Sequence, residues 1–386
     1  MMSGQGELEL YVHIPFCIKK CRYCDFLSAP ASAYTREVYL KRLCRQIRNF
    51  RAEEEYEIRS IFIGGGTPSL LSGDEMKLLF ESIHDRFVLD PGVEITAECN
   101  PGTLTPEKLS AYASCGINRL SIGLQSADDQ ELKLLGRIHT WDEFLRNYEA
   151  AREAGFQNIN IDLMSALPGQ TISSWERTLT LTAQLHPEHI SAYSLIIEEG
   201  TPFYEMYADA EDKRSRGLDQ PMLPTEETER EMYWLTDSIL ASHGMHRYEI
   251  SNYALPGYEC IHNIGYWRRI PYAGFGLGAA SLIGSRRYRM TEDLDAYLRG
   301  DDSEKDVVLL SQKDEEEETM FLGLRMTEGV SLDEFRKTFG VSMYSLYGST
   351  IEKLRSLGLI EAAGGRLRLT AKGTDVSNPV LAEFLL

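Results

Sequence analysis

The sequence predicts an α/β protein: a partial (β/α)6 barrel of the TIM type, followed by an α+β extension and a small winged-helix-like domain. Two observations predict the barrel. Short apolar runs alternate with segments of helical spacing, which makes six β/α units within roughly the first 200 residues. The chemically unusual residues also stand directly after the expected strands, at the face where barrel enzymes hold their active sites.

The barrel elements can be placed in order along the chain. Strands are expected at residues 8–14, 60–63, 93–97, 119–123, 159–164 and 189–195. The helices between them are expected at residues 33–50, 74–87, 106–115, 141–154 and 173–185. Because helices join successive strands, the strands should run parallel and the helices should cover the outside of the sheet.

The regular alternation stops after Glu199. Residues 208–228 are polar and acidic and contain proline, which indicates an exposed excursion before a helix at residues 229–242. Residues 248–281 are rich in Gly, Tyr and Trp and lack a helical period. Residues 301–318 contain nine acidic residues and two lysines, which indicates a solvated connection.

The C-terminal end returns to regular structure. Helical segments at residues 331–340 and 344–357 precede the hairpin-like sequence EAAGGRLRLT, and together they predict a helix, helix and wing. We therefore divide the chain into a barrel at residues 1–240, a second region at residues 241–310 and the winged-helix-like domain at residues 311–386.

The charge balance argues against nucleic acid as a partner. The 386 residues include 40 Lys plus Arg and 59 Asp plus Glu, for a net charge of −19, and the wing lacks the basic stripe of a DNA reader. No stretch approaches the ~18 apolar residues of a transmembrane helix. The opening MMSGQGELEL lacks the features of a secretory leader, so the expected location is the cytoplasm.

Three of the seven cysteines form a tight cluster, Cys17, Cys21 and Cys24, in the spacing C-x3-C-x2-C. Such close spacing is unsuited to loop-closing disulfides, whereas thiolates are good ligands for zinc or for iron–sulfur clusters. Zinc knuckles usually combine two short ligand pairs of the form C-x2-C or C-x2-H, and the sequence shows no second pair to partner this loop. A structural zinc site stays open as an alternative. Three thiolates around a cubane would leave one iron free to bind a ligand.

Further polar groups follow the later strands. Three groups come just after the second, third and fourth expected strands: Gly64-Gly65-Gly66-Thr67-Pro68, Glu98-Cys99-Asn100-Pro101 and Gln125-Ser126. Asp162 lies near the end of the fifth expected strand. All of these groups should gather with the cysteine loop on one face of the barrel.

These motifs resemble a known family. YVHIPFCIKKCRYCDF resembles the radical S-adenosylmethionine (SAM) signature in the form found in oxygen-independent coproporphyrinogen III oxidases and in HemW-type haem chaperones. The blocks IGGGTPSLL, ITAECNPG, RLSIGLQS, NIDLMSALPGQT and HNIGYW resemble those of the same family in the same order, and they cover nearly the whole chain.

The resemblance implies two cofactors in the barrel. Cys17, Cys21 and Cys24 would bind a [4Fe-4S] cluster whose fourth iron takes the amino and carboxylate groups of SAM. Residues at matching positions would contact SAM, namely Tyr11, Tyr23, Gly65, Gly66, Thr67, Glu98, Gln125, Arg137 and Asp162. Ile196 and Ala280 match the pattern more loosely. Taken singly, each has an ordinary alternative, such as a tight turn, a capping carboxylate or a surface cation.

Three features favour the chaperone branch. The oxidases carry a further cysteine two positions after the third cluster ligand, where this chain has Phe26, and they have a longer segment before the cluster loop. HNIGYW resembles the haem-binding HNxxYW motif, which makes His262 the expected haem ligand, although a lone histidine beside aromatics is often a hydrogen-bonded core residue. Five nearby arginines could pair with haem propionates or form a salt-bridged surface: Arg268, Arg269, Arg286, Arg287 and Arg289.

The resulting expectation is a cytoplasmic haem chaperone with a [4Fe-4S] cluster, SAM and haem as its cofactors, and residues 241–310 as its haem-binding region. It would pass haem to an acceptor protein, which could be respiratory or membrane-associated, with SAM and the cluster required for the transfer or regulating it. The alternative is an oxygen-independent coproporphyrinogen III oxidase, which decarboxylates two propionates to vinyl groups. A radical SAM methyltransferase is a third class, one that does not need HNxxYW.

Overall fold

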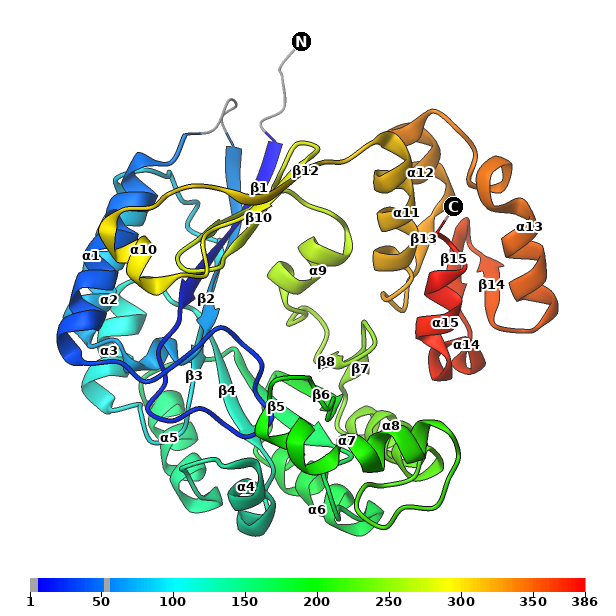
Figure 1. The fold of residues 1–386 in the computed structure, drawn as a ribbon, viewed down its shortest axis with the longest axis horizontal. Coiled ribbons are helices and arrows are strands. Elements are labelled where there is room, and N and C mark those ends of the chain that lie inside the picture. The colour runs from blue at the N-terminus through cyan, green and yellow to red at the C-terminus, as the bar shows by residue number, and fades with distance from the viewer. Residues whose placement is uncertain (1–5, 52–55, 386) are drawn as a thin grey trace.

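The computed structural model describes residues 6–51 and 56–385. Its centre is one twelve-stranded sheet in the order β12-β11-β10-β9-β1-β2-β3-β4-β5-β6-β8-β7. The six central strands run parallel: β1 (Gly6–Ile14), β2 (Tyr56–Gly65), β3 (Glu94–Cys99), β4 (Arg119–Gln125), β5 (Ile159–Ser165) and β6 (His189–Ser194). The expected partial (β/α)6 barrel is confirmed, and the sheet stays open (Figure 1).

Helices cover the outer side of these strands (Figure 1): α1 (Ala33–Asn49), α2 (Gly73–His84), α3 (Pro106–Ser114), α4 (Asp129–Leu135), α5 (Trp141–Glu153) and α6 (Ile172–Ala183). Alternate residues of a strand face opposite sides. In β1, Leu8, Leu10 and Val12 join the hydrophobic core, which leaves Glu9 and Tyr11 for the interior of the barrel. This division supplies polar side chains to the inner face.

Two segments differ from the sequence-based expectation. The expected excursion at residues 208–228 begins inside helix α7 (Pro202–Ser215), which starts at the N-cap Thr201 and carries i,i+4 ion pairs such as Lys213–Asp209. The expected solvated connection at residues 301–318 holds strand β12 (Lys305–Leu309) and helix α11 (Gln312–Gly323). In both cases, charged composition concealed a helix; α11 begins with a capping box formed by Ser311 and Asp314.

The region after α8 (Glu226–Ser242) extends both edges of the sheet. Its elements are β7 (His246–Arg247), β8 (Asn252–Ala254), α9 (Ile261–Trp267), β9 (Tyr272–Phe275), β10 (Ala280–Ile283), β11 (Arg286–Arg289) and α10 (Leu294–Arg299). Strand β9 pairs with β1 in parallel, and β8 pairs with β6 in antiparallel fashion. Helix α9 contacts β2 and α11 and lies between the sheet and the C-terminal unit (Figure 1).

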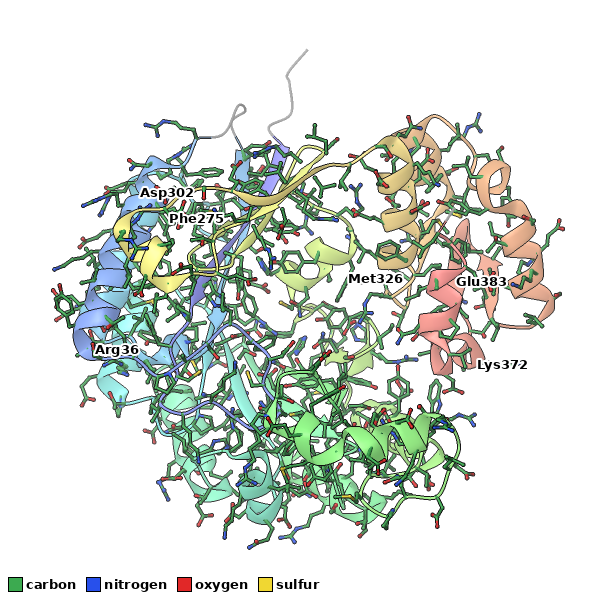
Figure 2. All side chains as sticks on the ribbon, in the orientation of Figure 1. Arg36, Phe275, Asp302, Met326, Lys372 and Glu383 are labelled. Carbon is green, nitrogen blue, oxygen red and sulfur yellow. The ribbon has the colours of Figure 1, made fainter. Side chains whose placement is uncertain are left out.

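The C-terminal unit has its own core and a three-stranded sheet, as the helix–helix–wing pattern predicted. Its elements are α11, β13 (Val330–Ser331), α12 (Leu332–Phe339), α13 (Met343–Ser356), β14 (Ile360–Ala363), β15 (Arg366–Leu369), α14 (Ala371–Asp375) and α15 (Ser377–Ala382). Met326 packs with Tyr248 where this unit meets the rest of the chain (Figure 2).

Across residues 6–51 and 56–385, none of the helices combines the length and the apolar composition needed to cross a bilayer. The sequence-based expectation about a secretory leader falls partly on residues 1–5, which lie outside the described residues.

Candidate functional site

The loop with the three cysteines runs from the end of β1 to α1 and is held by distant backbone. The Arg22 N–H donates to the Leu135 carbonyl at the end of α4 (3.0 Å), and the Phe203 N–H in α7 donates to the Arg22 carbonyl (3.0 Å). All three cysteines are partly exposed and line one cavity of about 310 Å³ at the carboxyl ends of the strands. Burial raises the pKa of the Cys24 thiol.

The donor set fits an iron–sulfur cluster. The Thr67 hydroxyl donates to Cys17 Sγ (3.5 Å) and the Arg137 guanidinium donates to Cys21 Sγ (3.6 Å), contacts that suit thiolates. In the described part of the chain, no three His, Cys, Asp or Glu side chains converge on a single ion position. A cubane does not require such convergence, because each of its thiolates binds a different iron.

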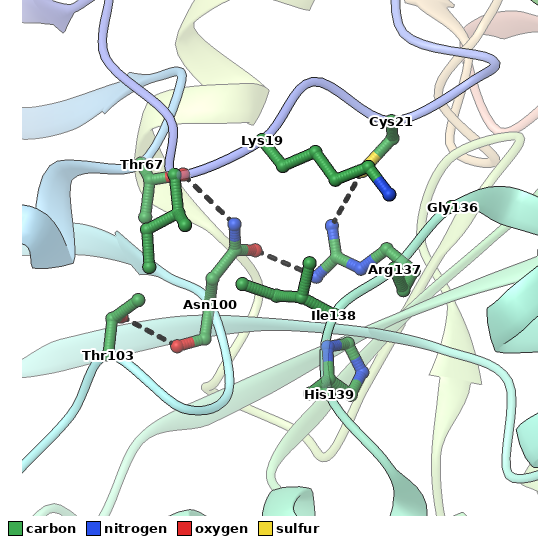
Figure 3. A pocket seen from close by; sticks show the side chains of 10 residues that line it. Lys19, Cys21, Thr67, Asn100, Thr103, Gly136, Arg137, Ile138 and His139 are labelled. Carbon is green, nitrogen blue, oxygen red and sulfur yellow. Dashed lines mark hydrogen bonds between the residues drawn. The ribbon is translucent and has the colours of Figure 1, made fainter. Parts of the chain in front are cut away.

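Arg137 is a half-buried cation at the centre of the site, just beyond the C-terminal end of α4. One Nη donates to Asn100 Oδ1 (2.7 Å) and to the carbonyl of Gly123. Asn100 in turn donates to the Thr67 hydroxyl (2.9 Å), which connects the ends of β2, β3 and β4 to the cysteine loop (Figure 3). A half-buried guanidinium without a carboxylate among these partners is suited to an anionic ligand.

Glu98 and Asp162 form a pair of carboxyl groups in the cavity. Burial, followed by repulsion from Asp162, raises the pKa of Glu98 to about 8, although the Gly65 N–H donates a hydrogen bond to it (2.9 Å). Asp162 accepts hydrogen bonds from Ser121 (3.1 Å) and Asn160 (2.7 Å). A cationic or hydroxyl-bearing ligand would relieve the repulsion between the two carboxyl groups.

Gln125, the last residue of β4, adopts a left-handed backbone with φ of 74°. The ladder between β4 and β5 shifts register between Gly123 and Gln125, and the Gln125 carbonyl oxygen Oε1 accepts a hydrogen bond from Tyr193 (3.1 Å). Non-glycine residues adopt this conformation rarely and often at functional sites. The irregularity aims the Gln125 side chain at the cavity.

The cavity unites most of the residues that the sequence singled out. Its lining includes Cys17, Cys21, Tyr23, Cys24, Gly65, Gly66, Thr67, Glu98, Gln125, Arg137 and Asp162. The other three expected SAM contacts lie elsewhere, as does the expected haem ligand His262. Tyr11 and Ala280 line a second cavity, and Ile196 is 67% exposed on the surface.

Sequence reasoning assigned no role to several polar residues of this cavity. Tyr193 and Ser191 reach it from β6, and Asn252 and Asn263 come from the region beyond the barrel. Asn100, two positions after Glu98, belongs to the group that the sequence placed on this face, although no contact was assigned to it. Asn263 belongs to HNIGYW, and its contribution to this cavity depends on where α9 packs.

His262 is a fully enclosed side chain with 1% exposure. Its Nδ1 is hydrogen-bonded to the Ser60 hydroxyl (2.8 Å) and its Nε2 to the Tyr266 hydroxyl (3.0 Å), while Phe62 stacks on the ring. Burial, with a contribution from Arg119, lowers the pKa of His262 to about 3, so the ring is neutral at pH 7. In this conformation both ring nitrogens have partners, and a metal could reach Nε2 only after Tyr266 moves.

The arginines near HNIGYW all have acidic partners. Arg268 pairs with Glu328, Arg269 and Arg287 with Glu318, Arg286 with Glu304, and Arg289 with Glu292 and Asp306. The salt-bridged arrangement that the sequence left open is therefore present, and a propionate would have to displace an existing carboxylate.

Comparison with family models identifies two segments. Residues 11–182 match the Radical SAM superfamily, and residues 310–376 match the HemN C-terminal domain. The second match covers most of the winged-helix-like unit.

Curated relatives align over almost the whole chain. The heme chaperone HemW of Lactococcus lactis is 37% identical, with 99% of this chain and 98% of that protein covered. The heme chaperone HemW of Bacillus subtilis is also 37% identical, with 97% and 98% covered. The solved coproporphyrinogen III oxidase HemN from Escherichia coli, a radical SAM enzyme, superimposes with a TM-score of 0.82 at 22% identity, covering 99% of this chain and 90% of that one. That likeness shows a shared fold.

Proposed function

Because this chain belongs to the HemW family of haem chaperones, within the radical SAM superfamily, we propose that it binds haem and transfers it to an acceptor protein. The observation that carries the proposal is the position of α9, the HNIGYW helix. Asn263 lines the cavity beside the cysteine loop, whereas Tyr266 and Trp267 line a second cavity with aromatic walls. One helix thus connects the expected SAM site to a surface suited to a macrocycle.

Cys17, Cys21 and Cys24 would hold a [4Fe-4S] cluster, with SAM beside it in the cavity. When bound, such a cluster offers one iron without a protein ligand to the amino and carboxylate groups of SAM and can supply an electron. Glu98 and Asp162 would accept hydrogen bonds from amino or hydroxyl groups, and Arg137 would pair with an anionic group. With the cluster and SAM bound, this site would be required for haem transfer or would regulate it.

We assign haem ligation to His262, which requires the Tyr266 hydroxyl to leave Nε2. Nδ1 would keep its bond with Ser60, the kind of outer partner that orients a metal-bound imidazole. His262→Ala should weaken haem binding by at least about tenfold and shift the Soret band. Tyr266→Phe is the matched variant: it frees Nε2 and should leave haem affinity unchanged or higher.

A titration of the reconstituted protein with haem, followed by transfer to apo-myoglobin as a generic acceptor, tests the function. Saturable binding and transfer faster than release of haem to buffer are expected. The His262 assignment would be wrong if His262→Ala bound haem with an unchanged spectrum and affinity, or if Tyr266→Phe lost the haem.

The oxidase remains the second candidate because the chain shares the fold of HemN. Phe26 is 62% exposed at the edge of the cavity, at the position where the sequence resemblance places a further cysteine in the oxidases. We expect no conversion of coproporphyrinogen III to protoporphyrinogen in the presence of SAM, reductant and an intact cluster. Product well above that of a cluster-free control would move this chain to the oxidase branch.

The cluster thiols must stay reduced to bind iron, which is why we propose the cytoplasm as the place of action. We also propose the functional division into a barrel at residues 1–240, a haem-binding region at 241–310 and a C-terminal domain at 311–386.

A further inference from the structure

A second cavity, of about 450 Å³, lies between the barrel side of the molecule and helix α11 of the C-terminal unit. Its walls come from β1, from the end of α9, from strands β9, β10 and β11, and from α11. They are largely aromatic and aliphatic: Tyr11, Tyr266, Trp267, Tyr272, Leu282, Phe321 and Leu322. Flat aromatic walls with aliphatic sides match the face of a planar apolar macrocycle.

Two arginines and one carboxylate complete the lining. Arg287 of β11 donates to both oxygens of Glu318 (2.6 and 2.9 Å), and Arg269 just after α9 donates to one of them (2.9 Å). Glu318 is 7% exposed and belongs to α11, so its side chain reaches across from the C-terminal side to the barrel side. Arg269 has a left-handed backbone with φ of 56°, an unfavourable conformation for arginine.

In this arrangement, the Glu318 carboxylate binds the two arginines in the way that a haem propionate would. A haem propionate is a carboxylate on a short chain, and it presents to a guanidinium the same two oxygens that Glu318 presents to Arg287. The cavity therefore combines an aromatic surface with a pair of cations that already hold a carboxylate. A propionate could use these cations only in place of Glu318.

We propose that haem enters this cavity with a propionate displacing Glu318 from Arg287 and Arg269, so that haem loading loosens the C-terminal unit from the barrel. This inference rests on the proposed haem binding. The reverse step follows: when haem leaves, Glu318 returns to the arginines and the interface closes. Haem binding would thereby change how the C-terminal unit is held against the barrel, and an acceptor protein could bind the two arrangements with different affinity.

The alternative is that Glu318 only stabilises the interface. The two explanations predict opposite changes in haem affinity when Glu318 is replaced. If Glu318 competes with haem, Glu318→Gln should lower the Kd for ferric haem by about three- to tenfold, and Arg287→Ala should raise it by about tenfold. If Glu318 only fastens the interface, its removal should leave the affinity unchanged or reduce it.

A matched control lies in the same interface outside the cavity. Glu328 pairs with Arg268 (2.7 Å) and Arg366 (3.1 Å), so Glu328→Gln weakens the contact without touching the cavity. It should not change haem affinity. Haem dimethyl ester, which lacks free propionates, should bind wild type and Glu318→Gln equally.

The experiment titrates the full-length, cluster-reconstituted chain with ferric haem by its Soret absorbance and measures amide exchange in α11 with and without haem. Thermal unfolding checks that each variant is folded, and Arg287→Lys replaces Arg287→Ala if the latter is not. Tighter haem binding by Glu318→Gln, together with faster α11 exchange on haem loading in wild type, is expected. Haem binding without either effect overturns the displacement and leaves the proposed function intact, whereas no haem binding by wild type overturns both.

Discussion

Replacing Gly265, in the middle of HNIGYW, by alanine tests how closely α9 packs against the inner face of the barrel. A Cβ built at this position would lie 2.0 Å from Oε1 and 2.2 Å from Cδ of Glu9. Glu9 has 0% exposure, and burial raises the pKa of its carboxyl to about 9, so a neutral, enclosed side chain blocks the way. Gly265→Ala therefore forces either the carboxyl or the helix to move by about 1 Å.

Overpacking of this kind costs about 1–3 kcal/mol, which exceeds the gain of roughly 0.5–1 kcal/mol that alanine brings to a helix interior. We expect Gly265→Ala to lower the free energy of unfolding by about 1–2 kcal/mol in urea titrations, and to weaken haem binding because α9 carries Tyr266 and Trp267. Gly348→Ala in α13 is the control: nothing lies within 4 Å of its added Cβ, so that variant should be slightly stabilised.

A double-mutant cycle with Glu9→Ala localises the effect. The Gly265→Ala penalty should largely disappear in the Glu9→Ala background, because the blocking carboxyl is gone. If Gly265→Ala were as stable as wild type, or equally destabilising in both backgrounds, α9 would not be packed against Glu9 as described.

Three further predictions concern the proposed cluster and SAM sites. Replacing Cys17, Cys21 or Cys24 by alanine should each abolish the iron expected on anaerobic reconstitution, about four per chain, while Cys44→Ala should retain it; zinc without labile sulfide in the native protein would contradict the cluster. Because the pKa of Glu98 is raised to about 8 from 4.5, the folded chain retains a proton that the unfolded chain loses, so the free energy of unfolding of ligand-free protein should fall as pH rises from about 4.5 to about 8. Glu98→Gln should flatten that slope in pH-dependent urea titrations, and an unchanged slope would refute the assignment. Arg137→Lys keeps the charge but loses the planar fork, so calorimetry should show SAM binding weakened by about tenfold, and unaltered affinity would exclude a direct contact.

Much of the cavity beside the cysteine loop could be predicted because strand ends are visible in the sequence. Parallel strands joined by helices bring their carboxyl ends together, so Glu98, Gln125 and Asp162 had to lie near the cysteine loop once the six strands were recognised. Tyr11 and Ala280, which were expected in the same cavity, line the neighbouring one. A strand's alternation tells which face a side chain occupies, but not which of two adjoining cavities it borders.

The main errors of the sequence-based prediction concern helices with many charged residues. Helix α11 was hidden in an acidic run, yet Glu316 and Glu318 are buried in it, and Glu318 finds its partners in β11 and after α9. Whether an acidic residue is solvated or enclosed depends on cations that arrive from elsewhere in the fold, and composition within a window does not contain them.

The amino-acid sequence by itself determined the barrel, the cysteine loop and the family, because these depend on residue spacing within a strand, a helix or one short loop. Only the tertiary structure decided the surroundings of His262 and of the arginines. Ser60, which holds His262 Nδ1, is 202 positions away in the chain, and Arg269 reaches Glu318 across 49 positions. Such partners meet because separate elements pack together, and that packing balances burial, charge and hydrogen bonding over the whole molecule.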